Sequence, residues 1–224
     1  MEIYEIIVRF FQTGGPFMYP IATVLVVGLA IAVERWLVLG SARYANRRAF
    51  DRVMASLREK DFEAVITAGN TSRVPIERIA AAGIARFTSS RRRDDIESAM
   101  EEGVMEALPR YEKRTQYLAT LANVATLLGL LGTIVGLIAA FTAVASAAPA
   151  EKASMLSSSI SVAMNTTAFG LISAIPLLLL HALLQTRTLE IVDSFEMASV
   201  KVLNLLSDVG GFPTRAAGQN PLRA

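Results

Sequence analysis

Two stretches decide the fold of this chain: Asn123-Val-Ala-Thr-Leu-Leu-Gly-Leu-Leu-Gly-Thr-Ile-Val-Gly136 and Asn165-Thr-Thr-Ala-Phe-Gly-Leu-Ile-Ser-Ala-Ile-Pro176. They lie inside two longer segments, residues 115–150 and 153–186, that contain no Asp, Glu, Lys or Arg. Each segment is longer than the roughly 20 residues that cross a bilayer, so both are predicted to be membrane helices. Small and hydroxylated residues among the Leu and Ile indicate helices that pack closely and line a polar passage.

A third span is predicted near the N-terminus. Residues 10–33 carry no charge, and residues 17–39 form one apolar segment containing Glu34-Arg35-Trp36, where an ion pair and an aromatic ring suit the membrane interface. We interpret it as a retained span, because the residues before it are not basic and no small-x-small cleavage site follows. The composition agrees with a small multi-span membrane protein: 224 residues, 53% of them hydrophobic, with a mean hydropathy of +0.43.

The distribution of Arg and Lys predicts the orientation. Basic residues crowd the region between the first and second spans, so this region is predicted to be cytoplasmic. The N-terminus and the Glu151-Lys152 turn then face the other side, and the C-terminal tail returns to the cytoplasm. The basic cluster Arg91-Arg92-Arg93 is followed at once by Asp94-Asp95, which favours a solvated face over nucleic-acid binding. The chain has no Cys and therefore no disulfides.

Helical patterns extend through most of the remaining chain. Between the first and second spans, helices are predicted at about 45–59, 61–68, 75–87 and 94–114. Their expected signals are a stop at Gly69-Asn70, starts at Ser72 and Pro75, and an Asp94-Asp95 cap. The last is expected to run on into the second span with a bend at Pro109. The predicted division is an interfacial helix at 1–15, membrane helices at 16–39, 115–148 and 158–187, a cytoplasmic helical region at 40–114, a periplasmic turn at 149–157, a cytoplasmic helix at 188–209 and a flexible tail at 210–224.

Polar and small residues gather on particular faces of the second and third spans. At 100° per residue, Asn123, Thr126 and Thr133 lie within about 80° of one another. The adjoining face carries Gly129, Gly132 and Gly136, which simple helix packing also explains. In the third span a single face carries Ala163, Thr167, Gly170, Ala174 and His181. If Thr133 meets Thr167 across neighbouring helices around an axis, the hydroxyls form a ring about halfway across the membrane.

Neither of these spans contains an Asp, Glu, Lys or Arg, although ion relays through membranes normally use an ionisable group. The group that carries the charge is therefore expected to come from another chain. His181 is a candidate group for proton uptake, although an interfacial His is more often simply hydrated. Glu34, beside Arg35, is interpreted as paired rather than transporting.

The segments 123–136 and 166–176, in this three-span layout, resemble the MotA/TolQ/ExbB proton-channel family, and the short outer turn is most similar to its ExbB and TolQ branch. The resemblance implies an all-α membrane protein with long cytoplasmic helical extensions, no cofactor and no enzymatic activity. It implies a pentamer around an ExbD-, TolR- or MotB-like single-span partner in the bacterial inner membrane, whose membrane Asp binds and releases the ion. Thr133 and Thr167 match the pore threonines of the family, and Thr126, Asn165 and Thr166 are added as pore-lining candidates.

Two positions depart from the ExbB pattern. Val162 stands where a Glu is frequent, and Thr126 stands where a Pro is frequent. The chain therefore leaves open proton or sodium as the ion, and import, envelope maintenance or motility as the role. A passive oligomeric scaffold is the alternative hypothesis. No paired carboxylates, metal-ligand spacing or activated nucleophile indicates an enzyme.

Overall fold

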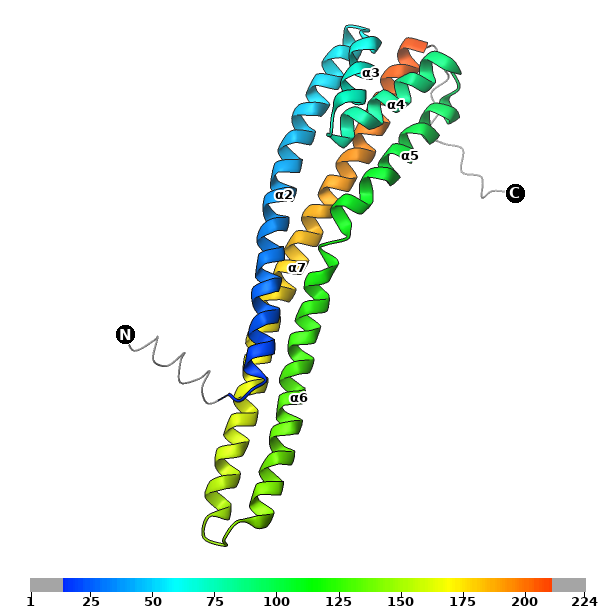
Figure 1. Cartoon of the computed structure of the whole chain (residues 1–224). Coiled ribbons are helices and arrows are strands. Elements are labelled where there is room, and N and C mark those ends of the chain that lie inside the picture. The colour runs from blue at the N-terminus through cyan, green and yellow to red at the C-terminus, as the bar shows by residue number, and fades with distance from the viewer. Residues whose placement is uncertain (1–13, 211–224) are drawn as a thin grey trace, which may run out of the picture. The chain divides into compact units, whose positions relative to one another are not determined.

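The computed structural model describes residues 14–210, and this part of the chain is helical throughout, with short turns and no strand (Figure 1). The helices are α2 (Met18–Arg58), α3 (Phe62–Thr71), α4 (Pro75–Ser89), α5 (Arg93–Glu112), α6 (Gln116–Ser146) and α7 (Lys152–Gly210). Three helical segments are long and apolar enough to cross a membrane: Met18–Arg58, Arg93–Ser146 when the short turn between α5 and α6 is disregarded, and Lys152–Val209. The prediction of an all-helical chain with three candidate membrane helices is confirmed. The cytoplasmic location of residues 40–114 and the pentamer stay predictions.

The chain divides into two compact units. Among the described residues, the first unit comprises residues 14–36 and Lys113–Gln185, and the second comprises Leu37–Glu112 and residues 186–210. The helices α2 and α7 contribute residues to both.

In the first unit, α2, α6 and α7 pack through small residues and aliphatic side chains. Gly28 of α2 receives Leu177 of α7, since a Cβ on Gly28 would lie 2.6 Å from a Leu177 methyl group. Figure 1 shows α6 and the first part of α7 side by side, joined by a short turn. The outer surface is apolar, and large side chains such as Leu127, Phe141 and Leu179 are more than 60% exposed. Such a surface suits lipid rather than water.

In the second unit, α4 packs between α3 and α5. Pro75 begins α4 at a position where the missing N–H costs nothing, and Asp61 caps α3 by accepting a hydrogen bond from the Ala64 backbone at 3.0 Å. Gly69 of α3 touches α4, because a Cβ there would lie 2.6 Å from the Glu77 carbonyl oxygen. The carboxylate of Glu77 is buried and bonds Arg52 of α2 at 2.7 Å.

Several predicted helix signals were wrong. The expected stop at Gly69-Asn70 fails because α3 continues to Thr71, and packing against α4 explains the glycine instead. Ser72 does not open α4: its hydroxyl accepts a hydrogen bond from the Val74 backbone, which itself precedes the helix. The expected start at about residue 94 agrees with the structure, since α5 begins at Arg93 with Asp94 and Asp95 in its first turn.

The fourth helix was expected to run into the second span with a bend at Pro109, but α5 continues through Pro109 and ends at Glu112. A turn at residues 113–115 separates it from α6. Glu34 of α2 and His181 of α7 contact this turn. The predicted interfacial helix, apart from residues 14 and 15, and the predicted tail beyond residue 210 lie outside the described residues.

Candidate functional site

Two threonine hydroxyls meet at the contact between α6 and α7. The Oγ1 atoms of Thr133 and Thr167 contact each other, and both residues are half-buried. The Thr167 hydroxyl also donates to the carbonyl oxygen of Gly129 at 3.0 Å, and the Thr133 hydroxyl lies 3.3 Å from the carbonyl oxygen of Ala163. Because each hydroxyl has one proton and two lone pairs, this group of four oxygen atoms offers more acceptors than donors. We call it the threonine cluster.

Glycines bring the two helices close enough for this contact. A Cβ on Gly170 would lie 2.8 Å from the Ala125 carbonyl oxygen and 3.0 Å from the Gly129 Cα, so backbone touches backbone at this crossing. About one turn further along α6, a Cβ on Gly132 would meet Thr166 and Phe17. Another turn on, a Cβ on Gly136 would lie 3.1 Å from the Ala163 Cβ. The glycine face therefore packs inside one copy of the chain, where it fixes the distance between the two threonines.

Thr166 belongs to the buried side of α7. Its hydroxyl donates to the carbonyl oxygen of Gly14 at 2.6 Å, and the residue is 2% exposed. Gly14 precedes α2, and the next residue, Gly15, has φ +76°, a conformation that favours glycine. Thr166 therefore holds the start of α2 against α7.

The other predicted site residues are distributed differently. Thr126 is exposed and its hydroxyl donates back to the Ala122 carbonyl oxygen at 3.1 Å, the usual bond of a Thr inside a helix. Asn165 is half-buried. Ala174 is buried in the same helix, next to Ser173, whose Oγ is fully buried without a hydrogen-bond partner in the described structure. Sequence reasoning missed Ser173, although the residue lies in the quoted motif.

His181 contacts the turn between α5 and α6. Its Nδ1 lies 3.0 Å from the carbonyl oxygen of Thr115. A carbonyl only accepts, so Nδ1 is the donor in this contact. At 1.5 Å per residue the 14 residues from Thr167 to His181 span about 21 Å, so His181 does not belong to the threonine cluster.

A second interaction at this turn was not predicted. Arg114 bonds the carboxylate of Glu34 at 2.5 Å, and Arg35 lies 3.6 Å from the same carboxylate. From the sequence, Glu34 was expected to pair with the adjacent Arg35 alone. The available signal was Arg114 itself, the last basic residue before a charge-free segment. Together with His181, this ion pair connects α2 and α7 to the turn at residues 113–115.

The threonine cluster is neutral and supplies oxygen atoms only. The whole of α6 lacks Asp, Glu, Lys and Arg, as does α7 from residue 153 to 186. Nor do three or more His, Asp or Glu side chains gather into a metal site anywhere in residues 14–210. The cluster can accept hydrogen bonds from a protonated group, or give oxygen ligands to a partly dehydrated cation, but it cannot itself hold a charge.

A comparison of the chain with known protein families finds a match. Residues 71–197, more than half of the chain, match the MotA/TolQ/ExbB proton channel family. The matched segment includes α4, α5, α6 and the part of α7 that contains the threonine cluster. No curated protein matches the chain.

Proposed function

Because the chain belongs to the MotA/TolQ/ExbB proton channel family, we propose that it is the ion-conducting subunit of a stator-type motor in the bacterial inner membrane. With an ExbD-, TolR- or MotB-like single-span partner, it would convert the proton motive force, or a sodium gradient, into mechanical work on the cell envelope. The family is one of multi-pass membrane channels rather than a known enzyme family.

The contact between Thr133 and Thr167 carries this proposal. Two half-buried hydroxyls and two backbone carbonyls form a polar group in helices that otherwise expose apolar side chains. Both hydroxyls bond to backbone carbonyls at the helix crossing, and such a group of oxygen atoms suits the lining of an ion path. Since both helices lack a carboxylate, the partner would supply the Asp that binds and releases the ion beside the hydroxyls.

The proposed assembly is a pentamer around the partner helices, with the N-terminus in the periplasm and the C-terminus in the cytoplasm. Spans at 16–39, 115–148 and 158–187, with a cytoplasmic region at 40–114 and a cytoplasmic helix at 188–209, are part of the proposal. Support comes from the positive charge between the first two spans and from the apolar surface of the first unit.

The decisive experiment removes the hydroxyls without changing side-chain shape. Thr133→Val and Thr167→Val would be compared with the parent after purification with the co-isolated partner and reconstitution into vesicles. Ion uptake would be followed under an imposed pH gradient and, separately, under a sodium gradient. We expect each variant to lower uptake at least tenfold, and the gradient that drives uptake in the parent identifies the ion.

Thr142→Val is the matched control. Thr142 lies on α6, is exposed, and its hydroxyl donates back to the Ile138 carbonyl oxygen at 2.9 Å. This variant should conduct like the parent. If Thr133→Val and Thr167→Val also conduct normally at equal abundance, the hydroxyls are not on the path. If the parent complex conducts no ion, the passive scaffold becomes the better description.

A further inference from the structure

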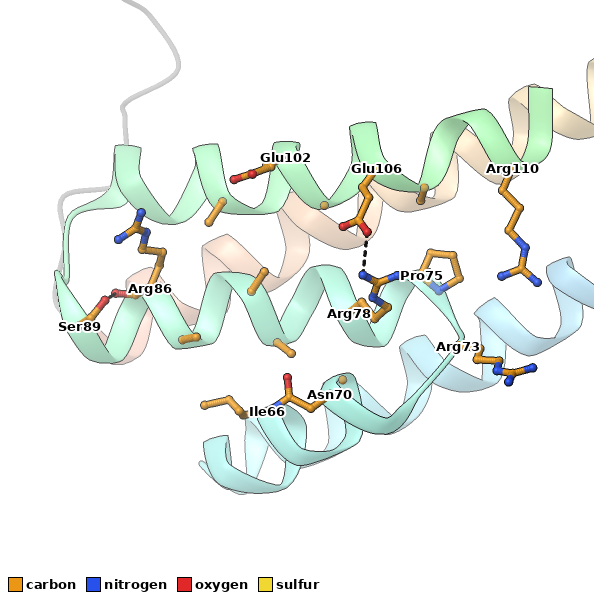
Figure 2. Close-up of a pocket in the computed structure, with 17 residues that line it drawn as sticks. Ile66, Asn70, Arg73, Pro75, Arg78, Arg86, Ser89, Glu102, Glu106 and Arg110 are labelled. Carbon is orange, nitrogen blue, oxygen red and sulfur yellow. Dashed lines mark hydrogen bonds and ion pairs between the residues drawn. The ribbon is translucent and has the colours of Figure 1, made fainter. Parts of the chain in front are cut away.

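The second unit carries a trough rimmed by arginines. It has a volume of about 690 Å³ and follows α4 between α3 and α5 (Figure 2). Its floor is made of small residues, among them Ala82, Ala85 and Gly103. Figure 2 shows Arg86 at one end and Arg73 and Arg110 toward the other. Glu102 and Glu106 of α5 also line the trough, and Glu106 bonds Arg78 at 2.9 Å, so the surface carries four arginines and two carboxylates. We call this surface the Arg trough. Because the arginines are spread along three helical turns, an elongated occupant fits it better than a compact anion.

A surface of the opposite charge lies elsewhere on the same unit. It covers a cavity of about 600 Å³ between α5 and α7, lined by Glu97, Glu101 and Glu196 and by no Lys or Arg. Met105 and Val200 border the same cavity with 69% and 56% of their surface exposed. We call this surface the acidic face. Exposed apolar side chains inside a charged border are typical of an interaction site.

The two surfaces lie on opposite sides of α5. At 100° per residue, the α5 residues of the trough and those of the acidic face point about 160° apart. They also occupy the same length of the helix, residues 99–110 and 97–108. A head-to-tail contact between identical copies joins two different, complementary patches, and these two surfaces meet that condition.

The positions of the charged residues along the helices agree with such a contact. Gly83 of α4 lies against Ile96 and Met100 of α5, whereas Gly103 lies against Ile79, so the two helices run antiparallel. Arg86 is therefore near the level of Glu97. If copies surround an axis that runs along their helices, residues at one level meet, and Arg86 of one copy faces Glu97 of the next.

We propose that the Arg trough of one copy receives the acidic face of the next copy, with Met105 placed over the Ala and Gly floor. The inference rests on the proposed homo-oligomer and names the surfaces that join it. Opposite charges give this contact its direction and its register, and the burial of exposed apolar groups favours it.

Cross-linking tests the contact cleanly because the chain has no cysteine of its own. The double variant Ala85→Cys with Glu97→Cys, treated in native membranes with a short bismaleimide, should give a ladder of covalent oligomers. Either single variant should stay monomeric, and co-expressed single variants should give dimers only. The matched control is Ala64→Cys with Glu97→Cys, since Ala64 is exposed on α3 outside the trough, and it should give no ladder.

Charge reversal provides a second measurement. Arg86→Glu or Glu97→Arg, each made in the cysteine-free chain, should lower the yield of oligomer in native mass spectrometry at least threefold, and the two together should restore it. Three results would overturn the inference: cross-linking of Ala85→Cys alone, attachment of Ala85→Cys to a different protein, or no ladder from a chain that remains oligomeric by native mass spectrometry. In the last case the proposed motor subunit stands. If the chain is monomeric with its partner present, both the proposed contact and the proposed motor subunit are wrong.

Discussion

At the residue scale, two buried hydroxyls of α7 differ in what they contact. Thr166 donates to the Gly14 carbonyl oxygen, whereas Ser173 is fully buried without a partner in the described structure. Thr166→Val should therefore lower the free energy of unfolding by about 1 kcal/mol, the usual net value of an internal hydrogen bond. Ser173→Ala should raise it by about 1 kcal/mol, because an unsatisfied buried hydroxyl is removed. Thermal unfolding of the detergent-solubilised protein measures both.

Measuring ion uptake by Ser173→Ala then shows whether this hydroxyl has a role in conduction besides its effect on stability. Uptake by Ser173→Ala at the parent level would mean that the hydroxyl has no role on the path. A stable Ser173→Ala variant with reduced uptake would contradict this and would add the Ser173 hydroxyl to the ion path.

At the element scale, the crossing of α6 and α7 depends on glycines. Gly170→Ala would place a Cβ 2.8 Å from the Ala125 carbonyl oxygen and 3.0 Å from the Gly129 Cα, and neither backbone atom can move aside easily. We expect a loss of about 1–3 kcal/mol of stability from overpacking, with reduced ion uptake as the threonines separate. Gly40→Ala is the control, because a Cβ on Gly40 meets nothing within 4 Å and Ala favours a helix by about 1 kcal/mol. Equal unfolding temperatures for the two variants would refute the close crossing.

Another element contact predicts a pH dependence. Tyr111 of α5 packs edge-on against Phe195 of α7, with ring centres 5.7 Å apart. Burial raises the pKa of Tyr111 above its ordinary 10.0, although the charge of Arg110 and the nearby Asn46 side chain oppose the rise. Below that pH the hydroxyl is neutral in both states. Above it the unfolded chain releases the proton first, so the stability of the folded chain falls as pH rises.

Tyr111→Phe should remove this part of the alkaline loss of stability. Unfolding of the parent, of Tyr111→Phe and of the exposed-site control Tyr44→Phe would be followed between about pH 8 and 11. The slope above pH 10 should flatten only in the first variant, and identical slopes in all three would contradict the assignment.

Helices were predictable from the sequence wherever a long pattern repeats, as in α6 and α5, because apolar runs and amphipathic faces are local properties. The errors came where distant residues decide. Gly69 resembles a helix stop but packs against α4, and the turn at residues 113–115 is held by Glu34 and His181 from other helices. The contact of Thr133 with Thr167 inside one copy depends on the close approach of Gly129 and Gly170. The pattern of one helix does not reveal which residues of another helix lie against it.

At the scale of the whole molecule, orientation in the membrane rests on charge. Residues 40–114 hold most of the Arg and Lys, whereas the turn after α6 contains Glu151 and Lys152 alone. Moving the basic region across the membrane is costly, so the turn between α6 and α7 is expected outside and the turn between α2 and α3 inside. Ala150→Cys and Glu59→Cys place single thiols at these exposed turns of a chain that otherwise has none.

A membrane-impermeant maleimide applied to spheroplasts should label Ala150→Cys at once and Glu59→Cys only after lysis. The parent, which has no thiol, controls for non-specific labelling, and equal labelling of both variants after lysis confirms that each thiol is reachable. Labelling of Glu59→Cys before lysis would mean that the chain has the opposite orientation in the membrane. The basic region would then lie in the periplasm, and the threonine cluster would face the ion gradient from the opposite end.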